Sequence, residues 1–149
     1  MKAWLSAPRT RTFLLAIAAA AVLIGLVAVG RAGGFKLLVS ASLDTTEERT
    51  EFLRSCGWEV DAASEQAQVI HIPETFSVVY ENYNELQRQQ GFDLAPYRGE
   101  NCTLYTYTVT NYPDDTQTVT ADLYLCKNRV IAGDVHSTSL NGFMVGVLK

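Results

Sequence analysis

The feature that most restricts the fold is a stretch of period-two alternation between Cys102 and Cys126. Its two runs, CTLYTYTVTNY and TQTVTADLYLC, are rich in Thr, Tyr, Val and Leu and are separated by Pro-Asp-Asp at 113–115. Alternation of strand-forming residues across a turn-forming segment is typical of a β-hairpin. A third run, RVIAGDVHS, follows the turn-prone pair Lys127 and Asn128. The sequence therefore predicts a three-stranded β-meander.

Two helices are expected before the meander. Thr45 and Glu48 make a capping box at the start of the first helix, and Gly57 ends it. Between Pro73 and Gly91, residues at helical spacing indicate the second helix: Phe76, Val79, Tyr80, Tyr83 and Leu86. An extended segment, AQVIHIP, separates the two helices. This order predicts an α+β domain with both helices packed on one face of a small antiparallel sheet.

The hairpin register follows from the side chains that must share a core. A three-residue loop at 113–115 pairs Tyr112 with Thr116 and brings all the core-facing residues of both strands to one face. The same register places Cys102 opposite Cys126 on the outward face. Outside the cytoplasm these two can form a disulfide; the alternative is two free thiols. Cys56 is expected to be a small buried apolar residue.

Threonines line the outward face of the predicted hairpin. The simpler interpretation is that these threonines have a high β-propensity and lie on the solvent-exposed face of the sheet. The alternative is a platform that binds a protein or a glycan, with aromatic side chains at its rim. The candidate binding residues are Thr106, Thr108, Thr118, Thr120, Tyr112 and Tyr124.

The best candidate for catalysis is the pair Asp134 and His136, which a strand places on one face. A two-residue β-turn after Cys126 directs both side chains to the core, whereas a three-residue turn directs Ile131 and Val135 inward instead. A hydrolase also needs a nucleophile and an oxyanion site, and no GxSxG elbow supplies them. The chain is therefore not expected to be an enzyme, and no motif indicates a metal or another cofactor.

Ahead of the domain, Thr12–Gly30 contains no charged residue over 19 positions. As a helix this segment is about 28 Å long, close to the thickness of a bilayer's hydrocarbon core. We expect residues 1–36 to hold a basic start and a retained membrane anchor, with a cleaved secretory signal as the alternative. The excess of Lys and Arg before the segment places the domain at 37–149 outside the cytoplasm.

Charge is segregated along the chain. All 16 acidic residues and only 7 of the 12 basic ones lie after residue 36, so residues 37–149 carry a net charge of minus nine. Such a domain repels phosphate backbones, and the sequence has no basic stripe that would offset this. Nucleic acid is therefore not an expected partner, whereas the membrane is one through residues 12–30.

Several segments resemble a bacterial family of envelope proteins known as domain of unknown function 4830. They are TTEERTEFLRSCGWEV, YENYNELQRQQGFDLAPYRG, YTYTVTNYP, VIAGDV and NGFM, which together span about residues 44–144. The resemblance implies an N-terminal membrane or signal segment and a location at the cell envelope of Gram-positive-type bacteria. It implies no activity, ligand or catalytic residue.

These features together predict a membrane-anchored extracytoplasmic domain that acts as a binding or regulatory module at the bacterial envelope. Its expected partner is an envelope protein or a glycan. Two alternatives are an envelope enzyme of hydrolase type that uses Asp134 and His136, and a purely structural envelope protein.

Overall fold

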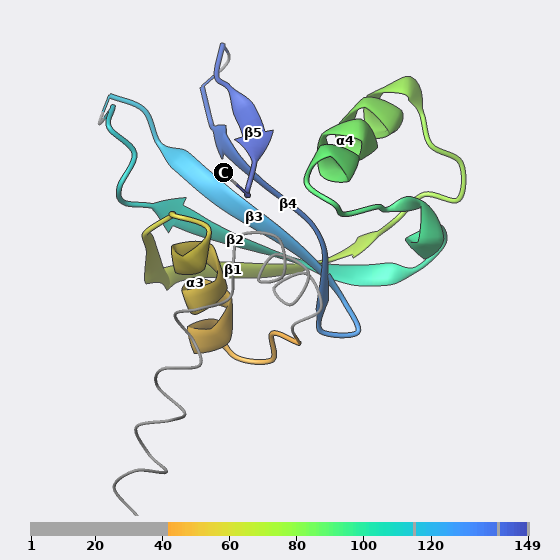
Figure 1. The fold of residues 1–149 in the computed structure, drawn as a ribbon, viewed down its shortest axis with the longest axis horizontal. Helices are drawn as coiled ribbons and strands as arrows, with labels where there is room; N and C mark the ends of the chain where they lie inside the picture. The colour runs from red at the N-terminus through yellow and green to blue at the C-terminus, as the bar shows by residue number, and fades with distance from the viewer. Residues whose placement is uncertain (1–41, 115, 140, 149) are drawn as a thin grey trace, which may run out of the picture. The chain divides into compact units, whose positions relative to one another are not determined.

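A computed structural model describes residues 42–114, 116–139 and 141–148 (Figure 1). The expected membrane or signal helix lies outside these residues. Within the described residues, no helix is both long enough and apolar enough to cross a bilayer. The elements in chain order are α3 (Thr46–Ser55), β1 (Val60–His71), α4 (Val78–Gln89), the 3-10 helix η1 (Ala95–Tyr97), β2 (Asn101–Val109), β3 (Val119–Cys126), β4 (Arg129–Ser137) and β5 (Met144–Gly146).

The five strands form one antiparallel sheet in the order β1-β2-β3-β4-β5. The α+β class and the predicted meander, β2 to β4, are confirmed. The predicted hairpin register is confirmed as well, because Tyr105 pairs with Leu123 and Thr108 with Thr120. The sheet is larger than expected, since β1 pairs with β2 and the short β5 adds to the far edge of β4.

The first helix begins and ends as the sequence predicts, and the second ends as predicted but begins only at Val78, after Phe76. The Thr45 side chain accepts a hydrogen bond from Glu48 N–H, and the Glu48 carboxylate accepts one from Thr45 N–H at 3.0 Å. At the other end Gly57 has a φ of 90°, and Trp58 N–H donates to the Leu53 carbonyl at 3.0 Å. This is a Schellman motif, which satisfies carbonyls that a helix end leaves unpaired. Gly91 and Phe92 repeat the same arrangement at the end of α4.

The two helices contact opposite faces of the sheet, so the prediction that both pack on one face is wrong. From α3, Arg49 hydrogen-bonds Tyr107 on β2, whereas from α4, Tyr83 hydrogen-bonds Asp134 on β4. Tyr107 is in register with Val135, and neighbouring residues of a strand point to opposite faces. Both faces of the central strands carry apolar side chains, and a single layer of helices cannot cover both.

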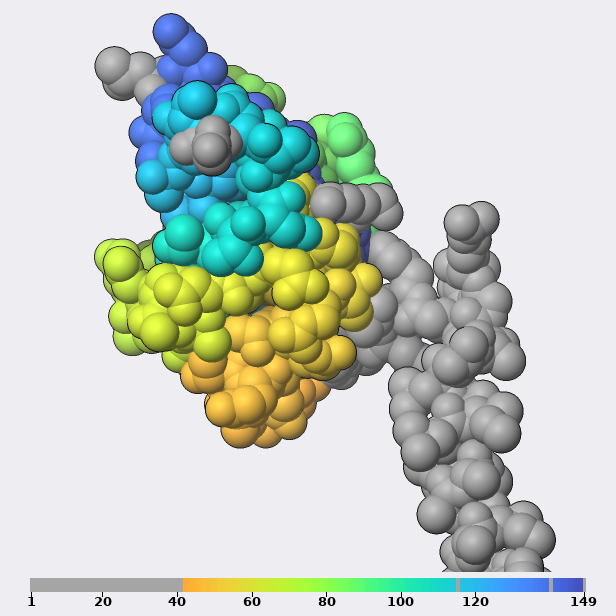
Figure 2. Space-filling model, turned by 90° about the vertical axis from the view of Figure 1, so that its left-hand side faces the viewer, coloured from red at the N-terminus to blue at the C-terminus, as the bar shows by residue number. Residues whose placement is uncertain are grey.

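Each face has its own hydrophobic cluster. The larger lies on the α3 side and is built around Phe52, Leu53, Trp58, Tyr107, Val119, Ala121, Leu123, Leu125 and Val135. The smaller lies on the α4 side and contains Ile72, Leu94, Cys102, Cys126, Ile131 and Ala132. Figure 2 shows the side of the molecule on which α3 (orange) packs next to the start of β1 (yellow).

A β-bulge decides which way the second half of β4 faces. Lys127 and Asn128 form a two-residue turn with positive φ angles, and Leu125 pairs with Val130. The register then shifts, so that Tyr124 pairs with Ala132 and Ile131 is the extra residue. Neither predicted alternative holds in full. The turn has two residues, yet Val135 points to the larger cluster because the bulge reverses the side-chain alternation.

A buried arginine joins α3 to the sheet. Arg49 is 4% exposed. Its guanidinium donates to the Glu65 carboxylate at 3.0 Å and to the Tyr107 hydroxyl at 2.9 Å, and lies 3.9 Å from the centre of the Tyr105 ring. The Tyr107 hydroxyl also hydrogen-bonds Glu65. Glu65 and Tyr107 therefore share one buried cation as a hydrogen-bond donor and also hydrogen-bond each other.

Replacing that cation is expected to destabilise the fold. Arg49→Met leaves Glu65 and Tyr107 without their shared partner, and we expect a loss of about 2 to 4 kcal/mol in the free energy of unfolding, measured by urea denaturation. Arg54→Ala on the same helix is the control, because its ion pairs with Glu51 and Glu59 are exposed. Its cost should stay within about 0.5 kcal/mol. Equal losses in the two variants would contradict a structural role for the buried network.

Candidate functional site

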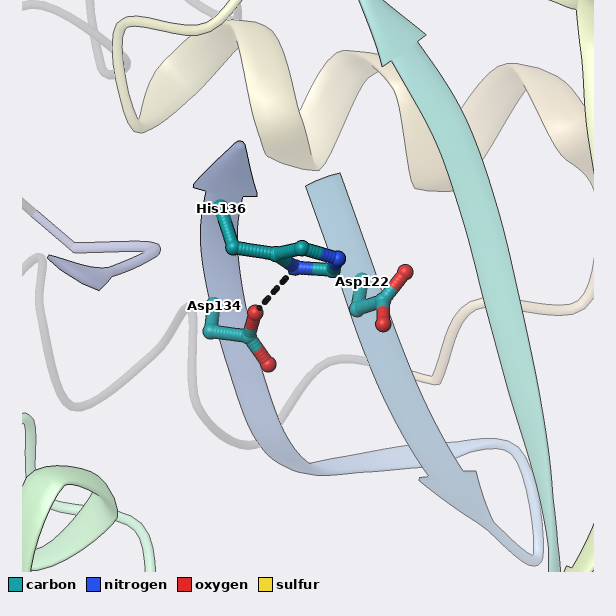
Figure 3. A group of neighbouring side chains, drawn as sticks. All are labelled: Asp122, Asp134 and His136. Carbon is teal, nitrogen blue, oxygen red and sulfur yellow. Dashed lines mark hydrogen bonds and ion pairs between the residues drawn. The ribbon is translucent and has the colours of Figure 1, made fainter. Parts of the chain in front are cut away.

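Three titratable side chains meet on the α4 face of the sheet (Figure 3). Asp122 on β3 pairs directly with Asp134 on β4, and His136 follows two residues along β4. Asp134 is 1% exposed and Asp122 is 8% exposed. The prediction that Asp134 and His136 share a face is confirmed. Sequence reasoning missed Asp122 as their neighbour, because the bulge that brings it opposite Asp134 leaves no signal in the residue pattern.

Hydrogen bonds join four side chains into one row, which we call the polar chain: Tyr83, Asp134, His136 and Thr120. Tyr83 donates its hydroxyl proton to Asp134 Oδ2 at 2.6 Å. His136 Nδ1 lies 2.8 Å from Asp134 Oδ1, and His136 Nε2 lies 3.1 Å from the Thr120 hydroxyl. Both oxygens of the buried carboxylate and both ring nitrogens are therefore engaged. The imidazole is fixed in orientation at both ends.

Burial and neighbouring charge shift the protonation equilibria of this group. The hydrogen bond to Asp134 raises the pKa of His136. Burial raises the pKa of Asp122, and the nearby Asp134 carboxylate adds to the effect. Burial also raises the pKa of Tyr83 far above its ordinary value, so its phenol is neutral and donates. The cluster favours bound protons and other positive charge.

The same side chains have the chemistry of a metal site. Ligand atoms of Asp122, Asp134 and His136 all lie within 4.8 Å of one another. A cation would, however, have to replace the hydrogen bonds that Asp134 makes with His136 and Tyr83. As it stands, the group is a completed hydrogen-bond network. The absence of a metal, predicted from the sequence, stays a prediction.

A groove lies beside the polar chain, with a volume of about 460 Å³. It is lined by Val79, Tyr80, Asn82, Tyr83, Leu86, Tyr124 and Met144. Tyr83 belongs to both features, because its hydroxyl reaches Asp134 and its ring lies 5.6 Å from that of Tyr124, which also lines the groove. Val79, Tyr80, Tyr83 and Leu86, which identify α4 in the sequence, therefore line the groove. Tyr80 and Tyr83 also pack partly against the smaller cluster.

Polar side chains add to these contacts where α4 packs on the sheet. Asn84 and Gln87 are fully buried. Gln87 Oε1 accepts a hydrogen bond from Gly133 N–H at 2.9 Å, and Gln90 Nε2 donates to the Gly133 carbonyl at 3.0 Å. These amides hold the C-terminal half of α4 against the edge of β4. Helical spacing alone could not separate a groove-lining stripe from a core-facing one.

The candidate binding residues are only partly brought together. Thr106, Thr108 and Thr120 are half-buried on the α4 face, and Thr106 donates to Asp122 at 2.6 Å. Thr118 is exposed. Tyr124 lines the groove, whereas Tyr112 stacks on Phe143 beside the larger cluster. The row of threonines is a partly covered surface that borders the acids.

The cysteines lie deeper than expected. Cys102 and Cys126 are 3% and 2% exposed, because the smaller cluster covers the face predicted to be outward. Burial, with a hydrogen bond to Cys126, raises the pKa of Cys102 to about 12. Both are free thiols in this structure, and their oxidation to a disulfide stays a prediction. Cys56 is buried as expected, and burial raises its pKa to about 11.

The contact between Asp134 and His136 predicts a measurable titration. In Asp134→Asn we expect the pKa of His136 to fall to its ordinary value of about 6.5 or below, because the carboxylate that raises it is gone. An NMR titration of the imidazole protons measures this, and His71→Gln assigns the signals, since the chain has two histidines.

The same contact links stability to pH. A folded-state pKa above the unfolded value gives stability that is complete below about pH 6.5 and is lost as pH rises through the folded-state pKa. The difference in unfolding free energy between the wild type and His136→Gln should therefore shrink as pH rises above about 6.5. A difference that does not change with pH would contradict an ionic contribution from this pair.

One comparison with known proteins identifies the family. No curated protein and no solved structure matches the chain. The family model described as domain of unknown function (DUF4830) matches residues 52–135, more than half of the 149 residues. The match spans Tyr83, Thr120, Asp122 and Asp134 and ends one residue before His136. The chain therefore belongs to the family known as domain of unknown function 4830.

Proposed function

We propose that residues 37–149 form an extracytoplasmic binding module, held at the membrane by residues 12–30, whose groove binds a small amphipathic molecule. The observation that carries this proposal is the gathering of exposed apolar side chains at the groove. Val79 and Met144 line it and are 78% and 51% exposed, and their neighbours Val78 and Val145 are 77% and 41% exposed. Such a concentration of uncovered apolar surface marks a binding site on a soluble domain.

The size of the groove favours a small molecule as its occupant. A volume of about 460 Å³ falls within the range of sites that bury ligands of drug-like size. Its walls are mainly aliphatic and aromatic, which suits an apolar body, and Asn82 with the phenols offers the few polar contacts that orient a ligand.

Charge selects the polar end of that ligand. Asp134 and Asp122 lie behind Tyr83, and the domain as a whole carries a net charge of minus nine. A negative potential of this kind disfavours an anionic head group. The ligand we propose therefore has a neutral or cationic polar end. We also propose, from the sequence, that a glycan or an envelope protein binds the neighbouring threonines of β2 and β3.

A neutral apolar fluorophore tests the groove. N-phenyl-1-naphthylamine should brighten on binding to the purified domain. Val79→Asp should raise the dissociation constant of the fluorophore at least about tenfold, because binding would then bury an unpaired carboxylate. Val69→Asp is the matched control, since Val69 is 73% exposed, lies on β1 and is not part of the groove lining. Equal binding by the two variants would contradict a ligand site in the groove.

Cell fractionation tests the tether. The full chain produced in a Gram-positive host should remain with membranes after alkaline carbonate washing, because Thr12–Gly30 is long enough to span the hydrocarbon core. Protease added to protoplasts should degrade the domain, and deletion of residues 2–36 should leave it in the cytosol. Release of a chain shortened at its N-terminus would identify a cleaved signal instead. A protease-resistant full chain in the cytosol would overturn the proposal.

A further inference from the structure

We infer that Thr120, His136 and Asp134 form a nucleophile, base and orienting acid that hydrolyse a neutral carboxylic ester whose apolar acyl group lies in the groove. The position of the acyl group rests on the proposed function. The chemical roles of the three side chains are inferred from the distances between them and do not depend on the groove.

The geometry is that of an activated hydroxyl. The Thr120 hydroxyl lies 3.1 Å from His136 Nε2, and His136 Nδ1 lies 2.8 Å from Asp134 Oδ1. Both distances are within hydrogen-bond reach, and the two contacts use opposite nitrogens of one ring. This is the arrangement by which a hydroxyl, a histidine and a carboxylate act as a unit on unrelated folds. The bulge at Ile131 creates it, because it turns His136 to the face of Thr120.

The acid is buried, whereas the base and the hydroxyl are both partly exposed. The Asp134 side chain is 1% exposed, that of His136 is 26% exposed, and Thr120 is half-buried on a face that borders solvent. A covered carboxylate orients the imidazole and stabilises its charged form. An accessible hydroxyl can meet a carbonyl carbon.

The groove adjoins this unit. His136 pairs directly with Met144, which is one wall of the groove. Tyr124, on another wall, lies four residues from Thr120 on the same face of β3, a distance of about 13 Å along the strand. An extended acyl chain of medium length spans that distance. An ester carbonyl at Thr120 therefore allows the hydrocarbon end to enter the groove.

The reaction is an acyl transfer in two steps. The Thr120 oxygen bonds to the ester carbonyl carbon while its proton passes to His136 Nε2, and Asp134 stabilises the imidazolium at Nδ1. The carbon–oxygen bond to the alcohol then breaks, and the alcohol leaves with the proton from Nε2. In the second step water repeats the attack on the acyl-threonine, His136 takes its proton and returns it to Thr120, and the carboxylic acid is released.

A donor for the developing oxyanion stands opposite the nucleophile. Thr108 on β2 pairs directly with Thr120. Within the described part of the chain, the Thr108 hydroxyl has no hydrogen-bond partner, although its backbone N–H donates to Ser64. A neutral hydroxyl at this position can donate to an oxyanion without adding charge.

Covalent trapping tests the nucleophile directly. A fluorophosphonate probe with an octyl chain should form a phosphorus–oxygen bond to Thr120 with loss of fluoride, and peptide mass mapping should locate it there. Thr120→Ala should lose the label and Thr120→Ser should retain it. Thr110→Ala is the control, because Thr110 is an exposed threonine that directly follows β2 and is not among the candidate binding residues. Absence of label at Thr120 in the wild type would overturn the inference.

Ester hydrolysis separates this inference from the proposed function. We expect p-nitrophenyl octanoate to be hydrolysed with a kcat/KM about 100-fold lower in Thr120→Ala and His136→Ala than in the wild type and in Thr110→Ala. N-phenyl-1-naphthylamine binding, measured on the same samples, shows that each variant is folded with an intact groove. Binding without Thr120-dependent hydrolysis overturns the inference and leaves the binding module standing. Hydrolysis without any binding of the fluorophore overturns the proposed groove ligand instead.

Discussion

The site depends on one constraint, the extra residue that Ile131 adds to β4. A two-residue turn in an unbroken ladder would direct Asp134 and His136 towards the larger hydrophobic cluster, where a carboxylate has no partner. The bulge moves both to the other face, opposite Asp122 and Thr120. It also sends Val135 into the larger cluster. A single inserted residue thus separates an apolar face from a polar one within the same strand.

Both faces of the sheet are used, in different ways. On one side a buried arginine and a continuous apolar cluster hold α3 in place. On the other, α4 is held by the amides of Gln87 and Gln90 and by the hydroxyl of Tyr83. Tyr80 and Tyr83 of α4 also pack partly against the smaller cluster, whereas Val79 stays exposed. The aromatic and aliphatic groove therefore lies open on the α4 side, beside the buried Asp122 and Asp134.

Sequence reasoning was accurate where local rules decide the outcome. The capping box at Thr45, the glycine stops at Gly57 and Gly91, and the hairpin register from Tyr105 to Thr120 each follow from a few neighbouring residues. The placement of the helices could not be read in this way, because it depends on how both faces of the sheet are filled.

The sequence predicted Asp134 and His136 as candidate site residues, but it did not predict which other side chains contact them. Asp134 and His136 stand two positions apart on a strand, so their shared face was expected. Their contacts with Tyr83 and Thr120 come from segments 51 and 16 residues away. Those contacts require the bulge and the seating of α4, and neither has a signature in the alternation of residues. Met144 was missed for a similar reason, since its three-residue strand is too short to show a period.

The glutamine contacts at Gly133 also bear on self-association. A strand at the border of a sheet offers its backbone groups to any other chain, and proteins that leave such a border open tend to aggregate. Here Gln87 and Gln90 occupy the amide and the carbonyl of Gly133, and Gln90 accepts a further hydrogen bond from Leu148 N–H at 2.9 Å. The two glutamine side chains thereby make the backbone hydrogen bonds that a neighbouring strand would make at Gly133. These contacts cover the backbone of β4 just beyond the reach of β5, which is only three residues long.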